Sequence, residues 1–175
     1  MSMEFDFTEP DHFCTGTVGP KGQRVFYLQA REAGEIVSLK LEKQQITALA
    51  DYLERLLEDL PEMRAPRGVA PNLLEPVQPA FAVGGLGVIY NERADRIILV
   101  AEELVTTNDD DEDDFTVAPE PDPDESPAEA RFHLSRPQVL SFIEQARLIV
   151  AAGRPPCPYC GRPLDPVSGF CPCVN

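Results

Sequence analysis

Short runs of alternating apolar and polar residues fill the first forty-one positions of the chain. Glycine, proline and charged residues separate these runs, for example at 19–22 and 33–34. Alternation with a period of two, broken by turn residues, predicts the strands of an antiparallel meander. The predicted strands cover residues 5–8, 12–18, 24–31 and 36–41.

The period of the apolar positions changes at Lys43. From there the apolar residues recur at intervals of three and four, which places them on one face of an amphipathic helix. Pro61 ends the pattern, because proline cannot continue a helix. The helix is expected to pack on the sheet through Ile46, Leu49, Ala50, Leu53, Leu56, Leu57 and Leu60.

A proline-rich connector at 61–79 leads to a second set of strands, predicted at 81–90 and 96–104. Three glycines lie inside the first of these strands, within 84–87. A phosphate-binding loop would be followed by a helix, whereas here a strand continues. The glycines therefore predict a β-bulge or a close approach of another backbone segment.

Residues 130–134 form the last predicted strand, and a helix follows to about Ala152. Ser135 and Gln138 have the spacing of a capping box at the start of this helix. Gly153 and the prolines after it stop the helix.

Sliding the chain by 93 residues superposes the two predicted helices. Upstream, the stretch 23–28 resembles 95–100 in the same relative place, at a different offset because the loop length differs. This pattern favours an internal repeat, although two unrelated strand-to-helix passages would also look alike. The matching pairs are Leu41 and Leu134, Lys43 and Arg136, Gln45 and Gln138, Ile46 and Val139, Leu49 and Phe142, Ala50 and Ile143, Asp51 and Glu144, and Leu56 and Ile149.

The predicted fold class is α+β, with two β-β-β-α halves that form an antiparallel sheet and carry two packed helices. Residues 1–153 make up this duplicated domain, which includes the connector at 61–79 and an acidic loop at 105–129. Residues 154–175 form an appended tail.

The net charge of −15 is concentrated in one segment. Thirteen acidic residues and no Lys or Arg lie between Glu102 and Glu129, so the rest of the chain carries a charge of only −2. Such a composition buries too little apolar surface to offset the entropy of ordering, and it predicts a mobile loop. The net charge of the chain is therefore no evidence that its folded part binds a basic partner.

The N-terminal residues show neither a basic leader nor an apolar run, so no signal peptide is expected. No stretch approaches the roughly 18 apolar residues of a membrane helix. A cytoplasmic location without a membrane partner is expected. In that reducing compartment, clustered cysteines hold metal more often than they form disulfides.

Four of the five cysteines lie in the last nineteen residues, as Cys157-Pro-Tyr-Cys160 and Cys171-Pro-Cys173. Gly161 completes the form of a zinc knuckle, a tight turn that lets two thiolates meet one metal. The ten residues between the pairs allow all four thiolates to close a tetrahedron. We therefore predict Zn²⁺ as the cofactor of a zinc-ribbon tail, with Cys157, Cys160, Cys171 and Cys173 as its ligands.

Other roles for the four cysteines are less well supported. A thioredoxin-like redox pair requires a β-α-β setting, and a disulfide pair requires an oxidising compartment. A catalytic zinc keeps an open position, usually with His or a carboxylate among its ligands, so four cysteines favour a structural site. No catalytic residue is predicted.

Cys14 lies on a predicted strand, with His12 two residues before it on the same face. A buried apolar filler is the favoured role of Cys14, since free cysteine is among the most buried residue types. A nucleophile with His12 as its base is the alternative. Nothing else in the sequence supplies an orienting carboxylate and an oxyanion site for it in a recognisable arrangement.

The C-terminal part carries a basic excess of three charges, and Tyr159 and Phe170 offer faces for base stacking. Phosphate neutralisation by so few charges gives little affinity, and that affinity is lost at moderate salt. Nucleic acid is therefore not the favoured partner.

The stretches 22–30, 41–44, 151–161 and 163–166 together resemble an uncharacterised family of actinobacterial proteins of this length, with similarity over nearly the whole chain. That family is a domain of unknown function. Its genes occur with those of a phosphoglycerate-mutase-like phosphatase and a phosphoinositide-kinase-like protein, so the resemblance implies a shared pathway and no mechanism.

The family pattern has a His two residues before the third cysteine and an Arg at the position of Cys173. This chain has Gly169 and Cys173 at those places. If both patterns bind zinc, the fourth ligand has moved by four residues, from His to Cys. Cys173 is therefore the ligand to test.

Together these features predict a non-enzymatic, zinc-containing protein that interacts with an unknown protein partner. The first alternative is a hydrolase acting on phosphorylated compounds, which only the gene neighbours implied by the resemblance suggest. The second is a weak nucleic-acid binder that acts through the zinc tail.

Overall fold

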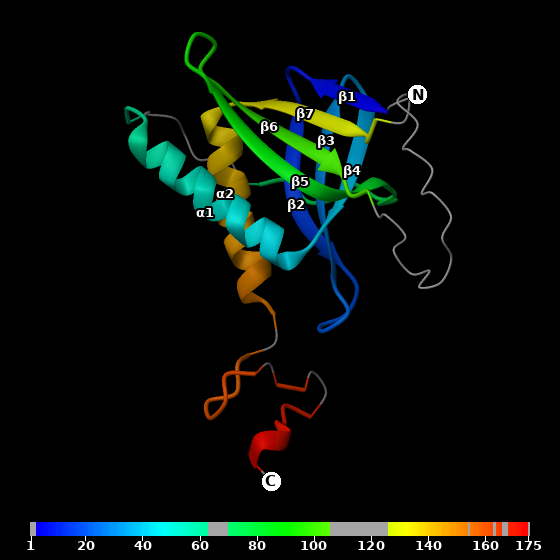
Figure 1. Ribbon diagram of the computed structural model, residues 1–175, viewed down its shortest axis with the longest axis vertical. Helices are drawn as coiled ribbons and strands as arrows, with labels where there is room; N and C mark the ends of the chain where they lie inside the picture. Colours follow the sequence, from blue (N-terminus) through cyan, green and yellow to red (C-terminus); the bar gives the residue numbers. More distant parts are fainter. Residues whose placement is uncertain are drawn as a thin grey trace, which may run out of the picture.

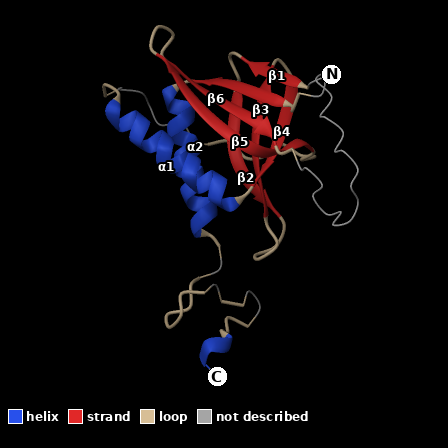
Figure 2. Cartoon of the chain, in the orientation of Figure 1, coloured by secondary structure: helices blue, strands red, loops and turns tan. Residues whose placement is uncertain are grey.

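The computed structural model describes residues 3–62, 70–105, 126–153, 155–162, 164–165 and 168–174. Within these residues the chain forms seven β-strands, two α-helices and one short 3₁₀ turn (Figures 1 and 2). A mixed α+β class is therefore confirmed. The elements are β1 (Glu4–Phe7), β2 (His12–Val18), β3 (Val25–Glu32), β4 (Glu35–Leu41), α1 (Lys43–Asp59), β5 (Pro79–Asn91), β6 (Arg96–Glu103), β7 (Glu129–Leu134), α2 (Arg136–Ala151) and η1 (Pro172–Val174).

The strands form one sheet in the order β1-β7-β6-β5-β4-β3-β2. The prediction of an antiparallel sheet is wrong at two places, because β4 pairs with β5 in parallel and β1 pairs with β7 in parallel. Helix α1 carries the chain back across the sheet, so that β5 starts beside β4 and runs in the same direction. The sheet is also larger than two three-stranded halves, since β1 adds a seventh strand.

The sheet is strongly curved. Its two edge strands, β1 and β2, are joined by only four residues. Five Cα steps span at most about 18 Å, whereas the edges of a flat seven-stranded sheet would lie roughly 29 Å apart. The sheet must therefore curl, and β1 indeed contacts β3. Figure 1 shows both helices on one side of it, with α1 crossing in front of α2.

The core lies between the concave face of the sheet and the two helices. Alternate residues of the central strands point into it, as the period of two requires. Phe132 on β7 contacts both Phe7 and Phe13, and Phe13 also contacts Phe142 on α2. Fully buried side chains from all the layers include Leu28, Leu39, Ile46, Leu53, Ile97, Leu99, Leu134 and Val139.

The glycines of β5 behave as predicted. The pairing of β5 with β6 shifts register between Val83 and Gly85, which marks a bulge. A Cβ atom at Gly84 would lie only 2.8 Å from the Cα atom of Leu104. Only glycine fits at such an approach of two backbones.

Residues 70–78, which we call the strap, cross the convex face of the sheet over β2 and β3. The backbone amide of Leu74 donates to Gln29 Oε1 at 2.7 Å, and Gln29 Nε2 donates to the Leu74 carbonyl at 3.0 Å. Leu73 lies against Gly16, where a Cβ atom would come within 2.7 Å of the leucine side chain. The strap therefore covers part of the sheet that the helices leave open.

Two predicted segments fall partly outside the described residues. Most of the acidic loop, at 106–125, and the middle of the connector, at 63–69, belong to these parts. The last residue of each predicted segment, Pro79 of the connector and Glu129 of the acidic loop, instead begins a strand. Neither described helix is both long and apolar enough to cross a membrane.

Candidate metal centre

The tail begins with a tight loop at 157–162. The backbone amide of Cys157 donates to the Arg162 carbonyl at 2.7 Å, and that of Gly161 donates to the Cys157 carbonyl at 2.9 Å. Gly161 has a φ of +73°, a left-handed conformation that glycine adopts at little cost. These bonds give the loop the tight turn expected of a zinc knuckle.

A second loop at 165–170 repeats this geometry. The amide of Asp165 donates to the Phe170 carbonyl at 3.1 Å, and Gly169, with a φ of +64°, donates to the Asp165 carbonyl at 2.9 Å. Asp165 Oδ1 accepts the amide of Ser168 at 2.7 Å. Asp165 and Ser168 thus hold the loop positions that Cys157 and Cys160 hold in the first.

This second loop was not predicted, yet the sequence contains a signal for it. Asp165-Pro-Val-Ser168-Gly169 has the spacing of Cys157-Pro-Tyr-Cys160-Gly161, eight residues later. An aspartate carboxylate accepts backbone amides in an Asx-turn, which supports such a loop without a metal. The second pair of thiols instead follows the loop, at Cys171 and Cys173.

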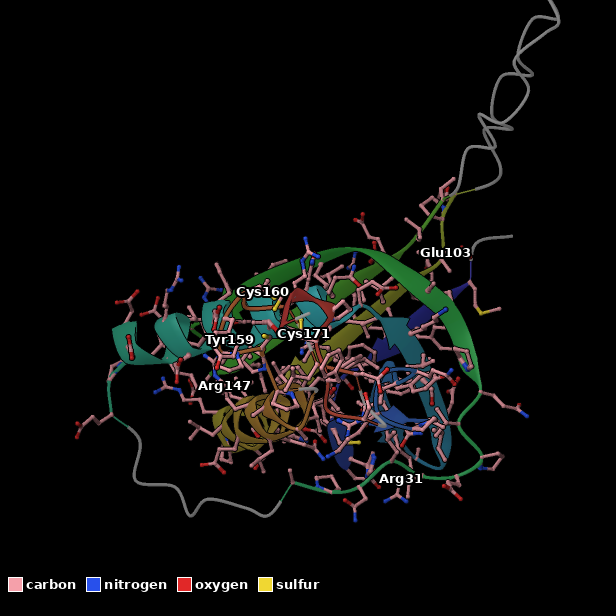
Figure 3. All side chains as sticks on the ribbon, turned by 90° about the horizontal axis from the view of Figure 1, so that it is seen from below. Arg31, Glu103, Arg147, Tyr159, Cys160 and Cys171 are labelled. Atoms are coloured by element: carbon pink, nitrogen blue, oxygen red, sulfur yellow. The ribbon has the colours of Figure 1, made fainter. Side chains whose placement is uncertain are left out.

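The two loops bring the four cysteines of the tail together. Their sulfur atoms all lie within 4.8 Å of one another. Cys157 Sγ is 3.5 Å from Cys173 Sγ, and Cys160 Sγ is 3.5 Å from Cys171 Sγ. Figure 3 shows the labelled Cys160 and Cys171 side by side. All four are free thiols rather than disulfides.

The donor set fits a tetrahedral metal ion. Zn–S bonds of about 2.3 Å place tetrahedral sulfur atoms about 3.8 Å apart, close to the separations in this cluster. Cys157 and Cys171 are buried, whereas Cys160 and Cys173 are exposed. Four thiolates around one ion leave no open coordination position, so the cluster is suited to hold a metal and not to activate a substrate.

The thiols of Cys157 and Cys173 have pKa values shifted in opposite directions. The backbone amides of Cys160 and Tyr159 donate to the Cys157 sulfur and lower its pKa to about 6. Hydrogen bonding to Cys171 and Cys160 raises the pKa of Cys173 well above its ordinary value. Crowded thiols ionise together only beside a cation, because neighbouring thiolates repel one another. A bound metal would supply that positive charge.

Cys14 and His12 also meet, as their shared strand face predicts. Cys14 Sγ lies 3.2 Å from His12 Nε2, and both residues are buried. Burial raises the pKa of the Cys14 thiol to about 12 and lowers the pKa of His12. Both shifts favour the neutral forms of the pair.

The hydrogen bonds of Gln29 decide whether His12 can act as a base. Its amide orientation is fixed by the two bonds to Leu74. The oxygen Oε1 therefore faces His12 Nε2, at 3.2 Å. Because Oε1 only accepts, Nε2 must carry a proton and cannot take one from Cys14. The geometry supports a buried polar contact and not a nucleophile.

The chain was compared with protein families, curated proteins and solved structures. No curated protein and no solved structure matches it. A family described as "Protein of unknown function (DUF3090)" matches residues 5–171. This range includes the folded domain and three of the four clustered cysteines, and it stops two residues before Cys173. Since the match covers almost the whole length, the chain belongs to this family of unknown function.

Proposed function

We propose that the protein is a non-enzymatic interaction protein whose tail binds one Zn²⁺ through Cys157, Cys160, Cys171 and Cys173. The observation that carries the proposal is the gathering of four thiol sulfurs within 4.8 Å of one another. Sulfur ligands in a tetrahedral set suit zinc, or iron in a sulfur-ligated site. Zinc is the metal proposed, because it needs only a closed set of thiolates and no redox partner.

The ion would hold in place a tail that has little core of its own. Most of its described residues are exposed, including Tyr159 at 80% and Phe170 at 54%. Tyr159 lies on the first loop, between Cys157 and Cys160, and Phe170 ends the second loop, next to Cys171. Aromatic residues are enriched at the centres of protein interfaces, because they bury a large area at a small entropic cost. We propose that Tyr159 and Phe170 contact a protein partner.

The two alternative functions gain no support from the site. Cys14 does not support a hydrolase, because its thiol is buried and the neighbouring His12 Nε2 also faces Gln29 Oε1. A hydrolase of phosphorylated compounds and a shared pathway with a phosphatase and a kinase-like protein stay predictions from family resemblance alone. The tail also lacks the charge excess that phosphate binding requires.

The metal is tested on the purified chain by elemental analysis. We expect one equivalent of zinc per chain, which Cys157→Ser or Cys173→Ser removes. Cys14→Ala is the matched control, because it deletes a thiol outside the cluster and should leave the zinc in place. Purified protein with intact thiols and no metal would contradict the proposal, and so would iron in the place of zinc.

The interaction is tested by affinity capture from a lysate of the native host. We expect the tagged chain to retain a protein that is released when a chelator removes the metal. A Tyr159→Ala and Phe170→Ala double variant should keep its zinc and lose the captured protein. Ile36→Ala, which changes an exposed apolar residue of β4, serves as the control. Capture that survives both metal removal and the double variant would exclude the tail as the interaction site.

A further inference from the structure

The four cysteines of the tail form two close pairs, and each pair joins the first cysteine motif to the second. Cys157 Sγ lies 3.5 Å from Cys173 Sγ, and Cys160 Sγ lies 3.5 Å from Cys171 Sγ (Figure 3). One member of each pair therefore comes from 157–160 and the other from 171–173. At this separation a small shift of either side chain brings the two sulfur atoms into bonding distance.

Each close pair contains one exposed and one buried cysteine. Cys160 and Cys173 are exposed, whereas Cys157 and Cys171 are each only 3% exposed. A small oxidant in the solvent therefore reaches one cysteine of each pair first. Its buried partner then lies close enough to attack the oxidised sulfur. Redox-sensitive cysteines have this arrangement, an accessible thiolate next to a second cysteine that resolves it.

The state of the sulfur atoms in a metal site favours this reaction. The thiolate, and not the thiol, attacks an oxidant, and cysteines that ligate zinc are deprotonated. Zinc has no redox chemistry of its own, so oxidation of the site takes place on the sulfur atoms. Cys14, the fifth cysteine, is fully buried on β2 and lies outside the cluster. The fold shields it from the same oxidant.

We propose that the metal centre is a reversible redox switch, in which peroxide joins Cys157 to Cys173 and Cys160 to Cys171 as disulfides and thereby releases the Zn²⁺. This inference rests on the proposed zinc site. Zinc is held by thiolates, so their conversion to neutral disulfides removes the ligands of the metal. A dithiol reductant restores the four thiols and the capacity to bind zinc.

The chemistry balances with hydrogen peroxide as the oxidant. The exposed thiolate of a pair attacks one peroxide oxygen and breaks the O–O bond, which gives a sulfenic acid and hydroxide. The buried thiolate then attacks the sulfenic sulfur, forms the S–S bond and expels a second hydroxide. Each pair thus gives two electrons to one peroxide molecule. The whole centre consumes two peroxide molecules and releases four hydroxides and one zinc ion.

The switch is tested by titrating the full zinc-loaded chain with hydrogen peroxide beside a chromogenic zinc indicator. Elemental analysis first establishes the zinc content. We expect release of the bound zinc and a fall in the thiol count of the denatured chain from five to one, that of Cys14. Excess dithiothreitol with added zinc should restore both values. Cys14→Ala is the matched control, which should release zinc at the same peroxide concentration and end with no free thiol.

Peptide mapping tests which cysteines react and how they pair. Dimedone, which traps sulfenic acids, should label Cys160 or Cys173 and neither of the buried cysteines. Cleavage before Asp165 separates the two cysteine motifs in the sequence. In the oxidised chain the resulting peptides should stay joined until a reductant is added. Tandem mass spectrometry should then find Cys173 linked to Cys157.

Several results would overturn the switch. Zinc that stays bound in excess peroxide would refute it and leave the zinc site itself intact. Disulfides within each motif, or dimedone on a buried cysteine, would refute the assigned pairs. Oxidation of Cys14 as fast as the cluster would show that peroxide unfolds the chain instead. A chain without zinc before peroxide is added would contradict the proposed function as well, so elemental analysis distinguishes the two failures.

Discussion

Gln138 makes at the start of α2 the same two contacts that Gln45 makes at the start of α1. Each side chain accepts the backbone amide of its N-cap residue, Glu42 at 2.8 Å and Ser135 at 2.9 Å. Each amide nitrogen then donates to a backbone carbonyl of another segment, Val83 at 2.9 Å for Gln45 and Pro10 at 2.7 Å for Gln138. Each glutamine therefore caps its helix and also links the start of that helix to another segment of the chain by a hydrogen bond.

Replacing either glutamine should destabilise the fold. We expect Gln45→Ala and Gln138→Ala each to lower the free energy of unfolding by about 1–2 kcal/mol, since each leaves a capping amide and a carbonyl without their partner. Gln44→Ala is the control, because Gln44 is exposed on α1. Urea denaturation measures the three variants. Equal stability of all three would show that the shared contacts contribute nothing.

The sequence predicts the elements more completely than their arrangement. Periods of two and of three to four place the strands and helices within a few residues, because both patterns are local. The parallel pairing of β1 with β7 joins residues 4 and 129, and no local pattern encodes it. The strap was also not predicted. It is held by single contacts, such as that of Leu74 with Gln29, and not by a periodic row of apolar residues that a sequence pattern would reveal.

The internal repeat illustrates the same limit. The sequence match sets Leu28 against Val100, whereas the pairing registers set Leu28 in the place of Leu99. A slip of one residue exchanges the buried and exposed faces of a strand. Leu99 is fully buried and Val100 is not, so only the three-dimensional register identifies the counterpart. Common ancestry of the two halves stays a prediction.

The close approach of Leu73 to Gly16 gives a second prediction. Gly16→Ala should displace the strap and lower the free energy of unfolding by about 1–3 kcal/mol, as overpacking does. In a Leu73→Ala background the same change should cost much less, because the obstructing side chain is gone. A double-mutant cycle measured in urea gives the coupling energy. Independent, additive effects would refute the contact.

The cysteine cluster was the easiest part of the site to predict, because ligand type and spacing lie within seventeen residues. Cys173 had the weakest support from family resemblance, yet its sulfur lies 3.5 Å from that of Cys157. The polar group around Cys14 was harder to interpret. Its role depends on Gln29 and Leu74, which are 45 residues apart, and no spacing in the sequence indicates that they meet.

Burial of His12 predicts a dependence of stability on pH. Desolvation lowers its folded pKa below 6.5, and Arg31 adds to this effect while Gln29 and Asp11 oppose it. The unfolded chain therefore binds a proton at His12 before the folded chain does. Stability from this group is complete above about pH 6.5 and is lost as the pH falls toward the folded pKa.

We expect urea denaturation between pH 7.5 and 5.5 to show a decline in the free energy of unfolding, with a slope from His12 of at most about 1.4 kcal/mol per pH unit. His12→Gln should flatten the decline, whereas His133→Gln, at a partly exposed residue paired with Asp6, should retain it. An equally steep decline in His12→Gln would assign the effect to other groups.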